Sequence, residues 1–269
     1  LLFPVLLMIA CTQKDSKPTF TVTLDPSIAK EAQDGRLLIL LSTDTTAEPR
    51  FQISDGVNSQ LVFGIDVDGM KPGEPVSVDS AFGYPLTRLE QIPAGDYRVQ
   101  ALLNRYETYQ LANGKTVKLP PDMGEGQQWN RKPGNLLSKP ASMYVAPGGN
   151  ISITIDQVIP AIDPPKDTEF VKHIRIQSKL LSDWWGKPTF IGAHVLLPAG
   201  FSEHPEARYP LMVYHGHFPS DFGGFQTTPP DPAMEAAAAE PPMEPGTPTS
   251  TVRTPGPPPA GPRRARAPA

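Results

Sequence analysis

Short segments in which apolar and polar residues alternate dominate the first 160 residues of this 269-residue chain. Alternation at every second position is typical of strands buried on one face, and continuous apolar runs of the same length are typical of core strands. Turn signals such as Asp68-Gly69 separate the segments, and helical periodicity is almost absent. The pattern predicts an antiparallel β-sandwich over residues 18–160. The strand-like segments are Phe20–Leu24, Arg36–Ser42, Leu61–Val67, Asp96–Asn104 and Ile151–Ile155.

A long stretch rich in Gly, Pro, Gln and Asn, residues 113–139, interrupts this pattern and contains Trp129. A loop of this length inside a compact domain is often functional or flexible. Trp129 lies beside Gln127, Gln128 and Asn130, and its indole has two possible roles. In the first it stacks on a sugar ring of a ligand; in the second it packs against the domain and holds the loop in place.

The chain changes character at two places. Residues 161–169 are proline-rich and predict a linker, and the stretch from Pro229 onwards contains no Leu, Ile, Phe, Tyr, Trp or Lys. Such a composition cannot bury enough apolar surface to offset chain entropy, so we expect a disordered Pro/Ala-rich tail over residues 229–269. The tail is either a docking tail or wall-associated stalk, or the product of a shifted reading frame or a truncation.

The start of the chain holds its single cysteine, Cys11, which excludes an intrachain disulfide and a cysteine-based zinc cluster. The apolar run before Cys11 is too short to span a bilayer. Met8–Cys11 resembles a bacterial lipobox, so we expect residues 1–17 to be the remnant of a signal peptide with its tether. A lipid on Cys11 would anchor the protein to a membrane of the cell envelope, in the outer membrane or periplasm of a Gram-negative host. The alternative is a chance cysteine in a hydrophobic N-terminus.

The net charge of −4 provides no basic face for phosphates, which argues against a nucleic-acid partner.

Strand-like segments resume after the predicted linker. Val171–Leu181 alternates around its isoleucines, and Thr189–Leu197 predicts another strand. Tyr209–Pro219 begins as an apolar run and ends in His215-Gly216-His217. This last stretch predicts a buried strand that opens into a loop carrying polar groups, where sheet-based enzymes keep their chemistry. The short loop before it allows an antiparallel pair with Thr189–Leu197.

Residues 170–228 resemble the start of the catalytic domain of esterase-like (esterase D-type) α/β-hydrolases, which are secreted or lipid-anchored bacterial enzymes. The resemblance rests on Lys179–Pro188, on Gly192–Phe201, and on the Tyr-Pro-led run from Arg208 to Pro219. It implies an α/β-hydrolase domain, a small ester substrate, no cofactor and an oxyanion-hole role for the loop His215-Gly216-His217. Backbone N–H groups in such a loop stabilise the negative oxygen of a tetrahedral intermediate. The alternative is that the motif only ends a strand.

The catalytic groups of that family are missing from this sequence. The fold needs a nucleophile in Gly-x-Ser-x-Gly, followed by an acid and a histidine, but no such motif occurs and no histidine follows His217. Ser220 and Asp221 are suitable residue types beside His215 and His217, yet immediate neighbours on one loop rarely converge into a triad. We therefore expect an incomplete hydrolase domain and a truncated, inactive member of a serine esterase or acyl hydrolase family.

Two other functions use the same residues differently. His215 and His217, with Asp221 as a third ligand, would suit a zinc hydrolase, although Pro219 stands where the metallo-β-lactamase pattern has an aspartate. We expect no metal, because most of such a site would lie elsewhere.

The other alternative is non-enzymatic: a lipid-anchored β-sandwich that binds a cell-surface glycan or protein partner through Trp129, Trp184 and Trp185. For Trp184-Trp185, packing under the sheet is the competing expectation.

Overall fold

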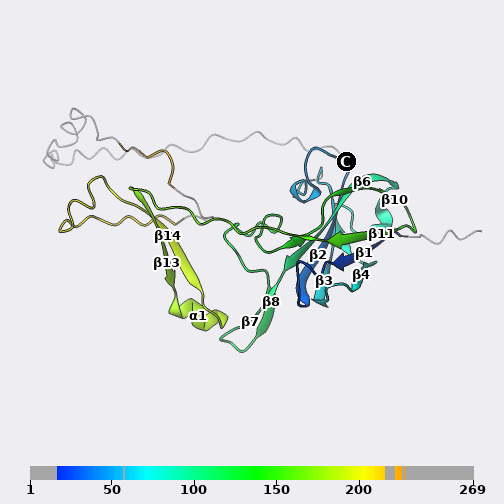
Figure 1. Cartoon of the computed structure of the whole chain (residues 1–269), viewed down its shortest axis with the longest axis horizontal. Helices are drawn as coiled ribbons and strands as arrows, with labels where there is room; N and C mark the ends of the chain where they lie inside the picture. Colours follow the sequence, from blue (N-terminus) through cyan, green and yellow to red (C-terminus); the bar gives the residue numbers. More distant parts are fainter. Residues whose placement is uncertain (1–16, 57, 216–221, 226, 228–269) are drawn as a thin grey trace, which may run out of the picture. The chain divides into compact units, whose positions relative to one another are not determined.

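β-Strands are the predominant regular secondary structure of the computed structural model, which describes residues 17–56, 58–215, 222–225 and 227 (Figure 1). The predicted mainly β class is therefore confirmed. All of the assigned elements lie within the unit that ends at Gly223. In chain order they are β1 (Thr19–Leu24), β2 (Gln33–Ser42), η1 (Pro49–Phe51), β3 (Leu61–Met70), β4 (Pro75–Val78), β5 (Phe82–Tyr84), η2 (Leu89–Gln91), β6 (Gly95–Arg105), β7 (Glu107–Gln110), β8 (Thr116–Leu119), β9 (Leu136–Leu137), β10 (Ala141–Val145), β11 (Asn150–Ile155), β12 (Gln157–Val158), β13 (Val171–Gln177), α1 (Lys179–Trp185) and β14 (Phe190–Leu196).

Two sheets form the larger part of this architecture. A three-stranded sheet has the order β11-β1-β4, and a seven-stranded sheet has the order β12-β9-β6-β2-β3-β5 with β10 paired to β6. The pairings are antiparallel as predicted, except that β1 and β11 run parallel, with Phe20 opposite Ile151.

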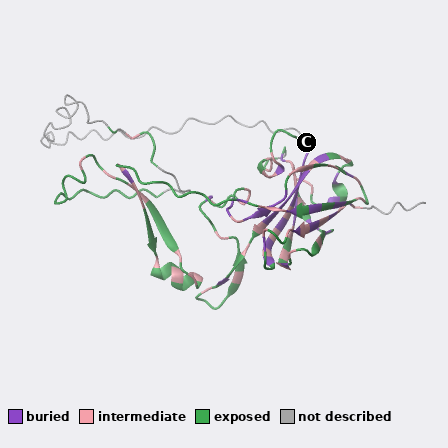
Figure 2. Ribbon diagram, in the orientation of Figure 1, coloured by how far each residue is buried: buried purple, intermediate pink, exposed green. Residues whose placement is uncertain are grey.

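The main core lies between these two sheets, whose strands carry most of the residues coloured as buried in Figure 2. The alternation in β1 and β11 turns every second residue inward, which is why both strands were recognisable from the sequence. Burying each large apolar side chain contributes about 1.5–3 kcal/mol. The core residues on the four central strands β1, β2, β6 and β11 are Phe20, Val22, Leu24, Leu37, Ile39, Leu41, Tyr97, Val99, Ala101, Leu103, Ile151, Ile153 and Ile155.

The opposite face of the seven-stranded sheet is also covered. Leu40 and Leu102 belong to a second buried cluster with Leu137 and Ile159, against which Trp129 packs. Burial on both faces explains the continuous apolar run in β2. Trp129 therefore holds its loop against the domain, as the second of its two predicted roles requires. Its indole packs on the second cluster, and its carbonyl accepts a hydrogen bond from Asn135 Nδ2 at 2.8 Å.

Two predictions made from local sequence signals, the turn at Asp68-Gly69 and the loop over residues 113–139, were wrong. Asp68-Gly69 lies inside β3 and does not end it, because Gly69 takes φ +74° and its N–H bonds to Asp34 Oδ1 at 2.7 Å. The pairing register with β2 shifts at this point, so the turn signal marks a β-bulge. The predicted long loop 113–139 contains β8, which pairs with β7, and β9 at its end.

After an exposed stretch over residues 160–169, β13 and β14 form a separate antiparallel pair in register from Val171–Leu196 to Gln177–Phe190. The predicted strand Val171–Leu181 ends early, at Gln177. Ser178 caps a short helix there, accepting a hydrogen bond from Leu181 N at 3.3 Å, and Gly186 closes the helix at φ +68°.

Candidate functional site

The predicted oxyanion strand does not form. Residues 209–215 contain no strand, and Leu211, Met212, Val213 and Tyr214 are 80–89% exposed. The predicted pairing with Thr189–Leu197 is also wrong, since in the described part of the chain β14 pairs with β13 alone. An apolar run becomes a strand only when neighbouring strands supply ladder partners, and consecutive strands of a sheet are not always neighbours in space.

His215 is the one residue of the predicted loop that the structure describes, and its side chain is exposed. Gly216, His217, Ser220 and Asp221 lie outside the described residues, as does Cys11. The oxyanion and lipid-anchor assignments therefore stay predictions. Within the described ranges, His, Cys, Asp and Glu form no group of three or more suited to a metal ion. No helix in these ranges is long and apolar enough to cross a membrane.

One face of the β13–β14 pair is apolar and open. Residues directly opposite each other in an antiparallel pair share a face, so the register places Ile174 with Ala193 and Ile176 with Ile191. The three isoleucines are 44–60% exposed.

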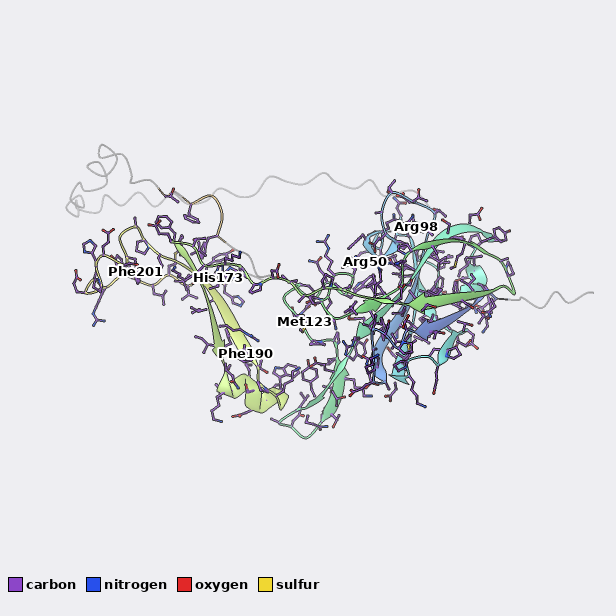
Figure 3. All side chains as sticks on the ribbon, in the orientation of Figure 1. Arg50, Arg98, Met123, His173, Phe190 and Phe201 are labelled. Atoms are coloured by element: carbon purple, nitrogen blue, oxygen red, sulfur yellow. The ribbon has the colours of Figure 1, made fainter. Side chains whose placement is uncertain are left out.

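The other face of this pair carries His173, labelled in Figure 3, and the strand register places His194 directly opposite it. The rings of His173 and His194 meet edge to face with centroids 4.5 Å apart. Asp167 Oδ1 lies 3.1 Å from Nδ1 of His173 and accepts a hydrogen bond from its backbone N–H at 2.9 Å. These contacts from His173 lower the pKa of the Asp167 carboxyl. Arg175, further along the same face, stacks over the ring of Phe190 at 3.9 Å.

The expectation that Trp184 and Trp185 of α1 pack under a sheet was wrong. Trp184 is 45% exposed, while Trp185 meets Tyr109 of β7 edge to face at 5.4 Å. The carbonyl of Trp184 accepts a hydrogen bond from the backbone N–H of Ala112 at 2.9 Å. Lys187 adds an ion pair with Glu107 and a hydrogen bond to the Tyr109 hydroxyl at 3.2 Å. These contacts join the end of α1 to the β7–β8 hairpin.

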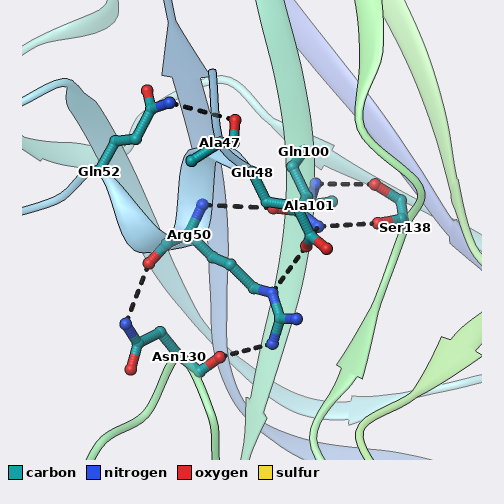
Figure 4. Close-up of polar contacts among 8 residues, drawn as sticks. All are labelled: Ala47, Glu48, Arg50, Gln52, Gln100, Ala101, Asn130 and Ser138. Atoms are coloured by element: carbon teal, nitrogen blue, oxygen red, sulfur yellow. Dashed lines mark hydrogen bonds and ion pairs between the residues drawn. The ribbon is translucent and has the colours of Figure 1, made fainter. Parts of the chain in front are cut away.

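A buried polar network covers the outer face of β6 (Figure 4). Gln100 is fully buried; its Nε2 donates to Glu48 Oε2 at 3.0 Å and to the Ser138 carbonyl at 3.1 Å. Its Oε1 accepts from Arg50 N at 3.3 Å. The Arg50 guanidinium bonds Glu48 at 2.7 Å and the Asn130 carbonyl at 2.7 Å. The network therefore ties η1 and the 128–138 segment to the sheet.

Charge in this network is balanced within it. Burial acts to raise the pKa of Glu48, but hydrogen bonds from Arg50 and Gln100 outweigh it, and the pKa is lowered. Glu48 therefore stays ionised and paired, which suits a structural role.

Lys132 is a buried charged group outside this network, with 3% of its surface exposed. Its Nζ donates to the Arg105 carbonyl at 2.6 Å. Burial lowers its pKa to about 8, with the charge of Glu125 acting in the opposite direction.

Sequence reasoning missed three of these features: the Gln100 network, the buried Lys132 and the histidine pair. The sequence does contain a signal for the Gln100 network, because a glutamine inside the apolar run of β6 predicts a buried polar partner. The histidine pair could be found only from the register between β13 and β14.

Comparisons with protein-family models, with curated proteins and with solved structures found no match for this chain. A functional proposal rests on its own residues.

Proposed function

We propose that residues 170–228 are the first part of the catalytic domain of an exported serine esterase or acyl hydrolase. Residues 18–160 are its accessory β-domain, and Cys11 is the lipid attachment point at the cell envelope. In this proposal the 269-residue chain itself does not hydrolyse esters, because it has no Gly-x-Ser-x-Gly and no histidine after His217.

The proposal rests mainly on the β13–β14 region, which is a two-stranded sheet with one uncovered apolar face. A two-stranded sheet is marginally stable alone, and here its isoleucine face is open to solvent. The exposed run Leu211–Tyr214 has strand-like composition without strand partners. Both features are expected of a sheet whose further strands and covering helices come from additional sequence.

The direct test is hydrolysis of a p-nitrophenyl ester by the purified 269-residue chain. We expect no turnover above buffer, and turnover abolished by a serine-directed inhibitor would refute the inactive assignment. The family assignment has its own test, the nucleotide sequence around codons 225–235 read in all frames. A frame that encodes strands and Gly-x-Ser-x-Gly supports it, and the protein made from that frame should hydrolyse the ester. If no frame does so, the assignment of residues 170–228 to a catalytic hydrolase domain fails.

A second candidate function is binding of a cell-surface glycan or protein by the β-sandwich. Phe82 and Tyr144 are 79% and 63% exposed on its strands β5 and β10, and flat aromatic side chains of this kind stack on sugar rings. Glycan binding that survives deletion of residues 170–269 and weakens in Phe82→Ala or Tyr144→Ala supports this function. The deletion keeps both buried clusters, whose members end at Ile159, so a failure to bind would count against the function.

A further inference from the structure

We propose that His173 and His194 form a two-imidazole site for a divalent transition-metal ion such as Zn²⁺ or Ni²⁺. Imidazole nitrogen is a ligand that suits both ions. The site is independent of the hydrolase proposal and of the His215-x-His217 motif.

The backbone brings the two rings to chelating distance. His173 and His194 are directly opposite in the β13–β14 register, where Cβ atoms lie about 4.5–5.5 Å apart. Two imidazoles bound to one ion through bonds of about 2.0–2.1 Å have ring centres about 4.5–5 Å apart. The observed centroid distance is 4.5 Å, so chelation requires rotation of the rings and no movement of the strands.

Asp167 supplies the orienting carboxylate that such sites use. A metal-binding histidine commonly passes its other ring nitrogen to a carboxylate, which sets the tautomer and the ring direction. The Asp167 Oδ1 to His173 Nδ1 distance is 3.1 Å, so His173 would bind the ion through Nε2. Asp167 is then a positioning residue for the site.

The charges and the space around the pair are compatible with a cation. Arg175, the nearest cationic residue on this face, stacks on Phe190, and Lys172 lies on the opposite face. Gly192 lies on the same face of β14, two residues before His194. A Cβ added to Gly192 would meet no atom closer than 3.9 Å. The backbone at Gly192 therefore leaves room next to His194.

Isothermal titration of ZnCl₂ and NiCl₂ into the full chain tests the site. The protein carries no histidine tag, and Cys11→Ser removes the one thiol. We expect one ion per chain, with affinity reduced at least tenfold in His173→Gln and in His194→Gln. The matched control His215→Gln/His217→Gln should bind as tightly as its parent. Loss of binding in the control alone, or no binding by the parent at millimolar metal, overturns the proposal.

A second readout separates ligation from loss of fold. Binding to the folded state raises the unfolding temperature by mass action, so Zn²⁺ should raise it in the parent and leave it unchanged in His194→Gln, whose metal-free unfolding should match the parent's. Asp167→Asn should weaken binding about 10- to 100-fold, as for other orienting carboxylates, while Cu²⁺ electron paramagnetic resonance still reports two nitrogen ligands. An unchanged affinity in Asp167→Asn would remove the positioning role.

Discussion

Replacing Gln100 by leucine tests whether the buried network on β6 holds the outer face of the sandwich together. The side chain makes three contacts, with Arg50 N, Glu48 Oε2 and the Ser138 carbonyl. Glu48 keeps its bond to Arg50, so leucine leaves two backbone groups without their side-chain partner. Each such buried group costs about 1–3 kcal/mol. We expect Gln100→Leu to lower the free energy of unfolding by about 2–4 kcal/mol.

Urea unfolding followed by circular dichroism and tryptophan fluorescence measures this change. Gln177→Leu, at an exposed strand position, is the matched control and should stay within about 0.5 kcal/mol of the parent. Gln100→Glu adds a pH test, because it places a second carboxylate next to Glu48. Its cost should be larger at neutral pH and shrink as the pH falls, because burial and the neighbouring Glu48 carboxylate raise the pKa of the introduced carboxyl above its usual value. A Gln100→Leu change below about 0.5 kcal/mol would refute the reasoning.

Three further outcomes follow from burial and backbone geometry. Because the pKa of Lys132 is about 8 in the folded protein and about 10.4 unfolded, the unfolded chain holds more protons between these values. The free energy of unfolding should therefore rise from pH 8 to pH 10 by up to about 2–3 kcal/mol relative to Lys132→Met; equal pH profiles for the two proteins would contradict this. Phe63→Ala, at a fully buried position, should cost about 3–5 kcal/mol in urea unfolding, whereas Phe82→Ala at an exposed one should cost little. Gly186→Ala should loosen the α1–β7 contact, seen as a change in tryptophan fluorescence, because its Cβ would lie 2.5 Å from the Gln110 carbonyl oxygen at φ +68°.

Strands that bury one face were the most predictable part of the fold. In β1 and β11 the two-residue period of the side chains directly records which face is inside. The apolar run of β2 was also recognisable, since burial on both faces leaves no polar alternation. What covers the second face was not predictable, because Trp129 and η1 reach it from distant parts of the chain.

Local signals misled where they depend on context. Asp68-Gly69 has the composition of a turn, and the same positive φ serves a bulge within β3 when Asp34 supplies a partner. Leu211–Tyr214 has the composition of a buried strand, but a strand also needs neighbours to pair with. Composition therefore specifies which segments are suited to a strand, while partners decide whether one forms.

By itself the sequence determined the mainly β class, the positions of the central strands and the absence of a Gly-x-Ser-x-Gly nucleophile motif, because these depend on residue type and local periodicity. Only the tertiary structure decided which side chains meet. It closed Gln100, Glu48 and Arg50 into one network and placed His173 opposite His194. Contacts of this kind depend on strand register and on packing between distant segments, which no local pattern encodes.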